Sequence, residues 1–494
     1  MVFNSFGFLI FFPIFFLLYK ILPLRVRWVM MLALSYFFYM SWQADLIYLI
    51  LFTTLVSYVC ARMIVKCEGR PRARKAYMIT AVAVSLLVLF FFKYFNFLSR
   101  SVTSVASLFG LGVSEFTLDL ILPVGISFYT FQTLSYVIDV YRGTIPAERH
   151  FGYYALYVSF FPQLVAGPIE RPENLIPQLK TRNAFDVNDC TVGLKFMLVG
   201  FFKKIVVADQ ISKFVDAVYN NAAGGVEIVN GFTVAVATVL FAVQIYCDFS
   251  GYTDIAIGCS RVLGIRLMQN FNDPYSAVNI KDFWRRWHIS LTSWFTDYVY
   301  IPLGGSRCKR WRHLLNIMIV FLLSGIWHGA AWTYVLWGVV HGVYQIVGNL
   351  TAKPRSRLLA KIGLKESGAL VKGSRRVITF ILVCLAWMIF RANSFSDLGT
   401  LLATLLAGWG GVSIGASLEA LGMSVVNIIT IILSVIVMKQ LDLQINTRPN
   451  LDNSTLEISP SRSVVYVALC WCVAIAWIIL LASNSESAFI YFQF

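Results

Sequence analysis

The chain has 494 residues, of which 58% are hydrophobic and only 13% charged, and its mean hydropathy is +0.71. Soluble domains are typically about 45–50% apolar and about 25% charged, so this composition excludes an ordinary soluble enzyme and predicts many lipid-facing helices. The formal net charge of +16 comes from basic residues in short segments between apolar runs, a positive-inside pattern that argues against nucleic acid as a partner.

Apolar runs that span, or nearly span, a bilayer are spread over the whole chain. They lie near residues 6–24, 28–42, 45–64, 77–98, 119–139, 151–168, 192–208, 231–258, 314–350 (as two helices), 377–391, 423–438 and 464–482. A crossing needs about 20 residues, and several runs are shorter or contain Pro or Gly, as re-entrant or broken helices do. We therefore predict an all-α, polytopic transmembrane fold with about eleven spans plus re-entrant and amphipathic helices. The first run lacks a preceding basic region and a small-residue cleavage site, so we interpret it as a retained helix.

Two basic segments, 66–75 and 353–376, are predicted to face the cytoplasm, because Lys and Arg are enriched in cytoplasmic loops. Counting helices from these segments places both termini outside the cytoplasm, provided that 398–416 does not cross. The section 264–313 is rich in Arg, Lys, Trp, Asn and Asp, although it lies between apolar runs. Amphipathic helices at the cytoplasmic face are expected there.

No soluble domain, fixed-period repeat or low-complexity tract interrupts the sequence. We therefore predict a single integral-membrane domain over residues 1–494. Within it, residues 122–350 contain the polar motifs, 351–376 form a cytoplasmic loop and 377–494 form C-terminal helices.

His328 is the histidine that stands out among five. It lies in the stretch 321–338, which contains no charged residue, and an ionisable group inside an apolar run is a functional candidate by default. A neutral imidazole there can act as a general base. The flanking Gly325 and Gly329 would let a backbone or a substrate approach closely. The alternative is that His328 only forms a hydrogen bond between helices.

His288 is the second candidate and lies in the stretch 281–295. On a helix, Asp282 would pair with Arg285 or Arg286. An interfacial helix anchored by Trp and Arg explains most of this stretch, but it leaves His288 unexplained. Of the remaining histidines, His150 fits a polar loop and His313 fits a basic cluster. His341 fits helix packing.

Further polar groups interrupt two other apolar stretches. Asp248 and Ser250 lie in 246–258, and Gln163 lies in 160–172 between two prolines. Such residues indicate irregular backbone that lines a cavity, in an enzyme or in a transporter. The sequence has no motif of a nucleotide-binding loop, a serine hydrolase or a zinc protease. Its nine cysteines form no CxxC pair, so neither a metal site nor a disulfide framework is predicted.

A series of stretches, in order along nearly the whole chain, resembles the membrane-bound O-acyltransferase family and, within it, the bacterial alginate O-acetyltransferase branch. They are LPVGISFYTFQTLSYVIDVYRG (122–143), FFPQLVAGPIERP (160–172), QIYCDFSGYTDIAIG (244–258), NFNDPY (270–275), DFWRRWHISLTSWFTDYVYIPLGG (282–305), GIWHGAAWTYVLWG (325–338), WMIFRA (387–392) and FIYFQF (489–494). The paired WHIS (287–290) and WHGA (327–330) segments are the specific part of this resemblance.

The resemblance implies a ring of helices around a central tunnel. It places the invariant family histidine at His328 and a second conserved polar position at His288, both as catalytic or substrate-positioning residues. Substrate-binding candidates are drawn from the same motifs and comprise Arg285, Arg286, Trp327, Asp248, Ser250 and Gln163.

The resemblance also implies a donor, an acceptor and a location. An acyl thioester, acetyl-CoA in the first instance, would approach from the cytoplasm, and Arg285 and Arg286 could attract its phosphates. No cofactor would be bound. The acetyl group would pass to an SGNH-hydrolase-like periplasmic partner protein and then to a polysaccharide such as alginate. The implied location is a bacterial inner membrane.

Three alternatives remain open from the sequence. The same chemistry could serve peptidoglycan or cellulose acetylation, or D-alanyl transfer to teichoic acid. A transporter could move an acyl donor without chemistry. A structural subunit of a polymer-secretion complex would not depend on His328.

Overall fold

The structure is a computed structural model, and it describes all of the chain except residues 182–185, 223–228, 410–413, 447–463, 482–488 and 491–494. The described residues form helices, turns and connecting segments, and no strand is found among them. The predicted all-α fold is thereby confirmed. A helix satisfies its own backbone groups, so a chain this apolar can cross a bilayer only in that form or as a closed barrel.

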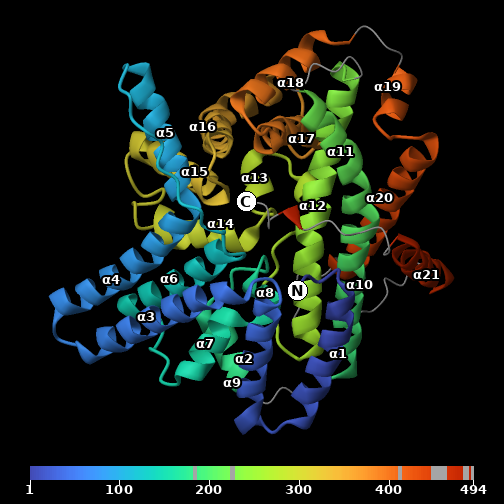
Figure 1. Cartoon of the computed structure of the whole chain (residues 1–494). Helices are drawn as coiled ribbons and strands as arrows, with labels where there is room; N and C mark the ends of the chain where they lie inside the picture. The colour runs from blue at the N-terminus through green and yellow to red at the C-terminus, as the bar shows by residue number, and fades with distance from the viewer. Residues whose placement is uncertain (182–185, 223–228, 410–413, 447–463, 482–488, 491–494) are drawn as a thin grey trace.

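The first third of the chain is helical, and part of it extends to one side of the molecule (Figure 1). Its elements are α1 (Phe6–Ile21), α2 (Leu24–Met40), α3 (Ile47–Lys66), α4 (Pro71–Leu89), the π-helical turn η2 (Phe90–Tyr94), α5 (Phe95–Leu108) and α6 (Ile126–Arg142). Helices α3 and α4 form an antiparallel hairpin, and α6 packs against both. The predicted apolar helix over 119–139 begins only at Ile126, because the left-handed Gly125 ends the preceding loop there.

The middle of the chain supplies the long central helix of the fold. Its elements are α7 (Phe151–Ser159), α8 (Phe161–Leu164), α9 (Pro172–Lys180), α10 (Val187–Phe201), the π-helical turn η3 (Phe202–Ala208), α11 (Asp209–Ala222) and α12 (Gly231–Val262). Helix α12 has 32 residues, packs against α10, η3 and α11, and is buried along most of its length.

The polar section that follows α12 differs from the prediction. It folds into short elements, namely α13 (Ile280–Trp284), α14 (Ile289–Phe295) and the π-helical turn η5 (Thr296–Tyr300). Phe283, Trp284 and Trp287 are buried, so the prediction of amphipathic surface helices is wrong for this part. The helical conformation is interrupted between α13 and α14, so aromatic side chains from more than one face of the segment can pack into the core.

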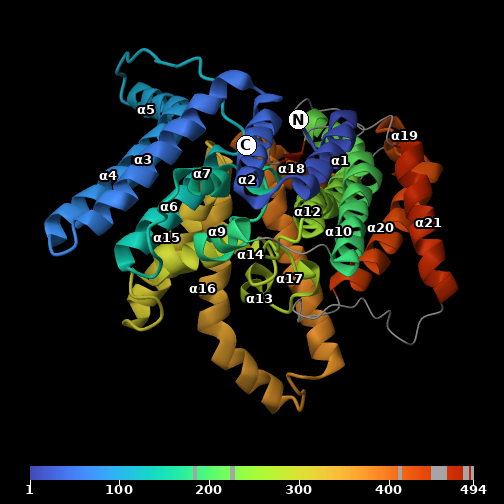
Figure 2. The same ribbon diagram turned by 90° about the horizontal axis from the view of Figure 1, so that it is seen from below.

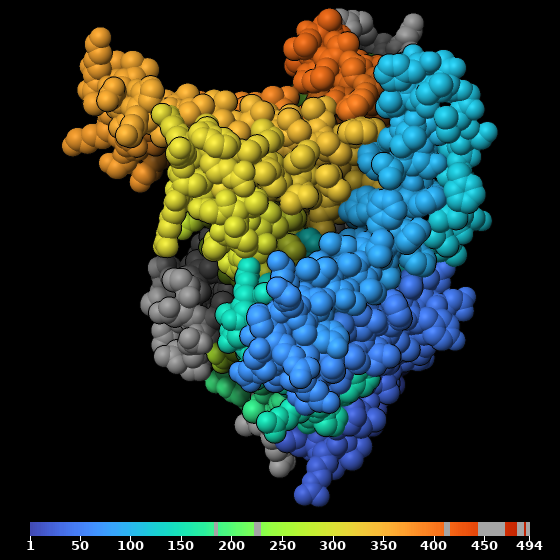
Figure 3. Space-filling view, turned by 90° about the vertical axis from the view of Figure 1, so that its left-hand side faces the viewer, coloured from blue at the N-terminus to red at the C-terminus, as the bar shows by residue number. Residues whose placement is uncertain are grey.

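The last part of the chain begins with two helices where the sequence predicts two. They are α15 (Arg310–His328) and α16 (Trp332–Lys361), and they are followed by α17 (Ala369–Arg391), α18 (Phe395–Ala407), α19 (Ile414–Ala420), α20 (Val425–Asn446) and α21 (Val464–Leu481). The predicted cytoplasmic loop 351–376 is instead mostly helical, because α16 continues to Lys361 and α17 begins at Ala369. These two helix ends project from the body at one end of the molecule (Figures 2 and 3).

Several helices are long and apolar enough to cross a membrane. Five such stretches occur in the described residues, namely Ala44–Lys66, Pro71–Leu108, Gly231–Val262, Ala369–Arg391 and Val425–Asp442, and three apolar helices are shorter. The chain is thus a multi-pass membrane protein. The total of about eleven spans stays a prediction. Helix α18 has 13 residues and measures about 20 Å, which is too short to cross a hydrocarbon core of about 30 Å.

Candidate active site

His328 is the last residue of α15 and its side chain lies inside an aromatic cage. The residue is 3% exposed. Its ring centroid lies 5.0 Å from that of Trp327, 4.9 Å from that of Trp337 on α16 and 5.5 Å from that of Phe390 on α17. The three consecutive helices α15, α16 and α17 therefore converge on this imidazole. The position of the His328 ring depends on how closely these helices pack.

Two glycines bring α15 and α16 into backbone contact beside His328. A Cβ atom on Gly325 would collide with the carbonyl oxygen of Tyr334, and one on Gly338 would collide with that of Phe321. Small residues are the usual means by which membrane helices approach this closely. The close contact that the sequence predicts for Gly325 is thus made with α16.

His288 lies at the N-terminus of α14 in an uncommon backbone conformation. Its φ of 45° is left-handed, and its side chain is fully buried. Asn270 holds the turn, because its Oδ1 accepts hydrogen bonds from the Ser290 amide at 3.2 Å and from the Ser290 hydroxyl at 2.9 Å, and lies 3.0 Å from Nδ1 of His288. Since an amide oxygen can only accept, Nδ1 of His288 donates, and the neutral ring then has its lone pair at Nε2.

The two histidines lie on either side of the Trp327 indole. The ring centroid of His288 is 5.9 Å from that of Trp327, and the ring centroid of His328 is 5.0 Å from it. Phe128 of α6 packs against both Trp327 and His288. The structure therefore brings together three of the predicted site residues, which are far apart in the sequence.

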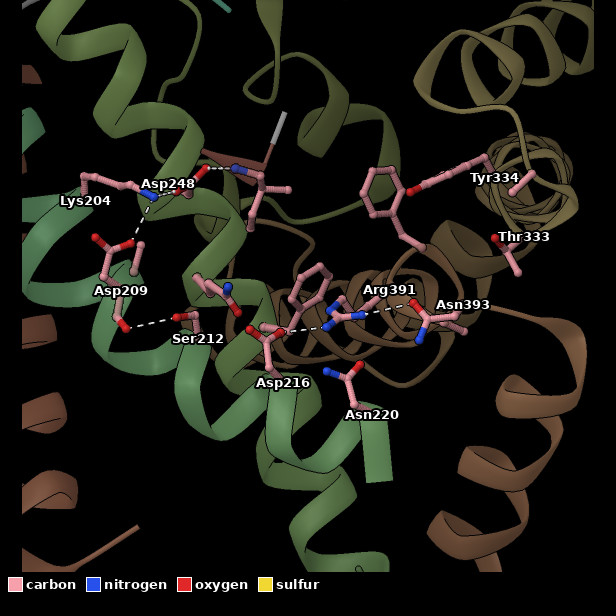
Figure 4. Close-up of a pocket in the computed structure, with 17 residues that line it drawn as sticks. Lys204, Asp209, Ser212, Asp216, Asn220, Asp248, Thr333, Tyr334, Arg391 and Asn393 are labelled. Atoms are coloured by element: carbon pink, nitrogen blue, oxygen red, sulfur yellow. Dashed lines mark hydrogen bonds and ion pairs between the residues drawn. The ribbon is translucent and has the colours of Figure 1, made fainter. Parts of the chain in front are cut away.

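A polar cavity of about 430 Å³ opens next to this cluster (Figure 4). Tyr334 and Phe390 form the part of its wall that adjoins His328, since Phe390 packs against both rings. Arg391, the next residue in this wall, pairs with Asp216 at 2.6 Å and also contacts Asn393. The cavity thus offers donors and acceptors for a hydroxyl-rich ligand directly beside the histidine cage.

A buried network of charges borders this cavity and ties the central helix to its neighbours. Lys204 of η3 contacts Asp248 at 2.7 Å and Asp209 at 2.9 Å, and both carboxylates line the cavity. Its neighbour Lys203 contacts Asp254 of α12 at 2.7 Å and Asp442 of α20 at 2.5 Å. Asp248 also accepts a hydrogen bond from the backbone amide of residue 490. Buried charges are tolerated in a membrane protein when they are paired in this way.

A second, smaller hollow of about 30 Å³ lies directly at His328. His328 and Trp327 line it, together with Lys93 and the N-terminal turn of α6, including Ser127. His328 therefore lines this hollow and reaches the wall of the larger cavity through Phe390, and it is buried inside the protein.

Comparison with known proteins identifies the fold that builds this site. The model of the membrane-bound O-acyltransferase family matches residues 147–395, which include both histidines and most of the cavity wall. The chain belongs to this family. It is therefore an O-acyltransferase.

Full-length relatives of this O-acyltransferase agree with the family match. The chain is 33% identical to the probable alginate O-acetylase AlgI of Pseudomonas putida over all of both chains. It is 37% identical to the protein of the same name from Pseudomonas aeruginosa, over 80% of this chain and 72% of that one. It is 35% identical to the peptidoglycan O-acetyltransferase of Helicobacter pylori, over 82% of this chain and 79% of that one. These similarities support the general activity of a membrane O-acetyltransferase.

The other predicted site residues of the O-acyltransferase lie in different surroundings. Asp248 lines the polar cavity, whereas Ser250 is buried in α12 and is not part of its wall. Gln163 is buried in α8, where its Nε2 donates to the carbonyl oxygen of Tyr157 at 2.6 Å, and it lines neither cavity. Neither Ser250 nor Gln163 lines one of these two hollows, and their role in substrate binding stays a prediction.

The predicted phosphate-binding arginines lie at the end of α13. Arg285 is exposed, and Arg286 pairs with Asp282 at 3.0 Å, which is one of the two pairings that the sequence allows. His341 accepts a hydrogen bond from Trp284 at 3.2 Å and is fully buried. In the segment between α8 and α9, burial raises the pKa of Glu170 to about 7.

The sequence analysis did not single out several residues that shape the site. Asn270 belongs to the quoted NFNDPY stretch and Arg391 to WMIFRA, so a signal was present for both without an assigned role. For Lys93 the signal is a lysine in the apolar run 77–98. Of the quoted terminal motif 489–494, residues 491–494 lie outside the described part of the chain.

Replacing Asn270 with alanine is expected to lower turnover by about tenfold or more, because His288 loses the partner that fixes its ring orientation. The neighbouring exposed Asn272→Ala is the matched control and should retain wild-type turnover. Steady-state release of CoA from acetyl-CoA, per folded molecule, measures both. Equal turnover in the two variants would contradict the positioning role of Asn270.

Proposed function

We propose that this O-acyltransferase moves an acetyl group from a cytoplasmic thioester, acetyl-CoA, across the inner membrane to a hydroxyl acceptor outside. The acceptor is a periplasmic SGNH-hydrolase-like partner protein that passes the acetyl group to a polysaccharide of the alginate type. The observation that carries the proposal is the buried His328 imidazole, which lines the smaller hollow and packs on Phe390 in the wall of the polar cavity. The names of the alginate O-acetylase relatives favour this acceptor class.

The course of α17 supports two-sided access. The helix begins at Ala369, within the basic segment 353–376, and ends at Arg391 in the cavity wall. Its 23 residues measure about 34 Å, close to the thickness of a hydrocarbon core. If the basic segment faces the cytoplasm, as the positive-inside rule predicts, the polar cavity opens on the outer side, where the hydroxyl acceptor would enter. Both termini would then be periplasmic.

The donor would approach from the opposite direction. Trp284 of α13 bonds to His341, which lies seven residues further along α16 than Tyr334 and so about 10 Å nearer its basic end. Arg285 and Arg286 follow Trp284 directly and are positioned to attract the phosphates of CoA from the cytoplasmic side.

In the proposed reaction His328 accepts the proton of the acceptor hydroxyl while that oxygen attacks the thioester carbonyl. His288 orients the thioester or stabilises the oxyanion. The tetrahedral intermediate collapses with cleavage of the carbon–sulfur bond, and the protonated His328 returns the proton to the departing CoA thiolate. The cage of Trp327, Trp337 and Phe390 keeps water away from the imidazole, which favours the neutral form that a base requires.

Purified protein in liposomes, supplied with acetyl-labelled CoA and a hydroxyl acceptor such as alginate oligosaccharides, should release free CoA, and His328→Ala should not. This reaction tests the donor directly, because a carrier would instead accumulate intact labelled acetyl-CoA in the lumen. Accumulation without CoA release, or no release from folded wild-type protein, would contradict the proposal. Trapping the product on added alginate oligosaccharides or on peptidoglycan fragments tests the acceptor separately.

Two other acceptors keep the same chemistry. The similarity to the peptidoglycan O-acetyltransferase makes peptidoglycan the second candidate. The similarity to the teichoic acid D-alanyltransferase of Bacillus subtilis is lower, at 28% identity over 56% of this chain and 70% of that one, so D-alanyl transfer ranks below acetyl transfer.

A further inference from the structure

The end of α15 carries three successive backbone carbonyls that its own helix cannot satisfy. The last four carbonyls of any α-helix lack an intrahelical partner, and here the chain leaves the helix in an extended conformation at Gly329. The carbonyl of Ile326 accepts a hydrogen bond from the Tyr94 hydroxyl at 2.9 Å. Those of Trp327 and His328 accept from the Lys93 ammonium at 2.7 Å and 3.3 Å. Two adjacent side chains therefore cap the helix end that carries His328.

Lys93 and Tyr94 belong to the π-helical turn η2 between α4 and α5. A π turn holds an extra residue within a helix and occurs often at functional sites. In this chain both residues of the turn reach one target, the end of α15.

The surroundings of the Lys93 ammonium make it a costly residue to keep. It lies within the apolar span Pro71–Leu108, and within the described part of the chain it forms no ion pair with a carboxylate. Its third hydrogen bond goes to the Ser127 hydroxyl at 3.2 Å, so all three ammonium hydrogens are used. It also lies 5.8 Å from the centroid of the Trp327 ring. Burying a lysine inside an apolar span costs free energy. A helix cap does not require a charge, since the neutral Tyr94 hydroxyl caps the Ile326 carbonyl.

We propose that Lys93 is a positioning residue for the acyl transfer. Its ammonium fixes the carbonyls of Trp327 and His328, and so sets where the imidazole of His328 lies. Because the positive charge also complements the negative end of the α15 dipole, the helix ends firmly at His328 rather than fraying. This role rests on the proposed function of His328 and extends it to a residue far away in the sequence.

Lys93→Met tests this role, because it keeps the length and the apolar stem of the side chain and removes its charge and donors. A displacement of about 1 Å at a reacting group can cost about 100-fold in rate, so turnover should fall by about tenfold or more. The KM for acetyl-CoA should stay within about twofold, since uniform substrate binding is untouched. Lys93→Arg, which keeps the charge, should recover part of the turnover.

Tyr94→Phe is the matched control, because it removes one neutral cap from the same helix end. Hydrogen exchange of the amides in 322–330 reports the order of that end without any need for activity. Exchange and turnover should change strongly in Lys93→Met and much less in Tyr94→Phe. Unchanged exchange and turnover in folded Lys93→Met, or equal losses in both variants, would overturn the proposal. If the wild-type protein releases no CoA, the proposed function fails, and the exchange result still decides the role of Lys93.

Discussion

His328→Ala is expected to lower turnover by roughly 10²- to 10⁴-fold, the range that general-base catalysis contributes. The physical reason is that no other described histidine lines either cavity, so a hydroxyl acceptor would have to lose its proton to solvent. The measurement is single-turnover release of CoA from acetyl-CoA by detergent-purified protein. The folded fraction is determined in the same sample by size-exclusion chromatography.

The control for this experiment is His341→Ala, because His341 is equally buried and lies on the helix that packs against α15. Its imidazole bonds to Trp284 and lines neither cavity. We expect His341→Ala to lower the unfolding temperature while turnover per folded molecule stays within about threefold. A loss as large as that of His328→Ala would show that burial of an imidazole, and not proton transfer, explains the effect.

Gly338→Ala is expected to have the second-largest effect, on stability and on activity together. The added methyl group would collide with the Phe321 carbonyl, and a rigid backbone cannot rotate away as a side chain can. Overpacking of this kind typically costs about 1–3 kcal/mol. Separation of α15 from α16 would also move His328 away from Trp337. Thermal unfolding in detergent and CoA release measure the two losses.

Gly348→Ala on the same helix is the matched control, since no heavy atom lies within 4 Å of its added Cβ. It should leave unfolding temperature and turnover unchanged, or raise stability slightly, because alanine favours the helix over glycine by about 1 kcal/mol. Equal behaviour of the two variants would contradict the close packing of α15 and α16.

The sequence predicts the helices of this fold well and the local shape around the site poorly. The apolar run 314–350 is predicted to be two helices, and α15 and α16 confirm this, because hydrophobic length is a local property. The broken segment between α13 and α14 is not predicted, since the left-handed turn at His288 depends on Asn270, which contacts it only after folding. Local periodicity does not contain such a contact.

The site residues follow the same division. His328 and His288 could be selected because an imidazole in an apolar or aromatic stretch is unusual. Both histidines lie beside Trp327, and Lys93 caps the end of the helix that carries His328. These contacts depend on how α4, α6 and α15 pack, which the sequence alone does not show. Ser250 and Gln163 share the polar signal of Asp248, but only Asp248 lines the polar cavity, so polarity alone does not predict which side chains face it.

The pairing of Lys203 with Asp442 has a consequence for how the chain is made. Asp442 lies 239 positions after Lys203, so this lysine enters the bilayer during synthesis long before one of its two carboxylates exists. Until α20 emerges from the ribosome, the nascent intermediate has one aspartate fewer at this buried ammonium. Late docking of α20 therefore completes the neutralisation of Lys203 and draws that helix to η3, whereas a chain that ends before α20 keeps this ammonium with Asp254 as its carboxylate partner.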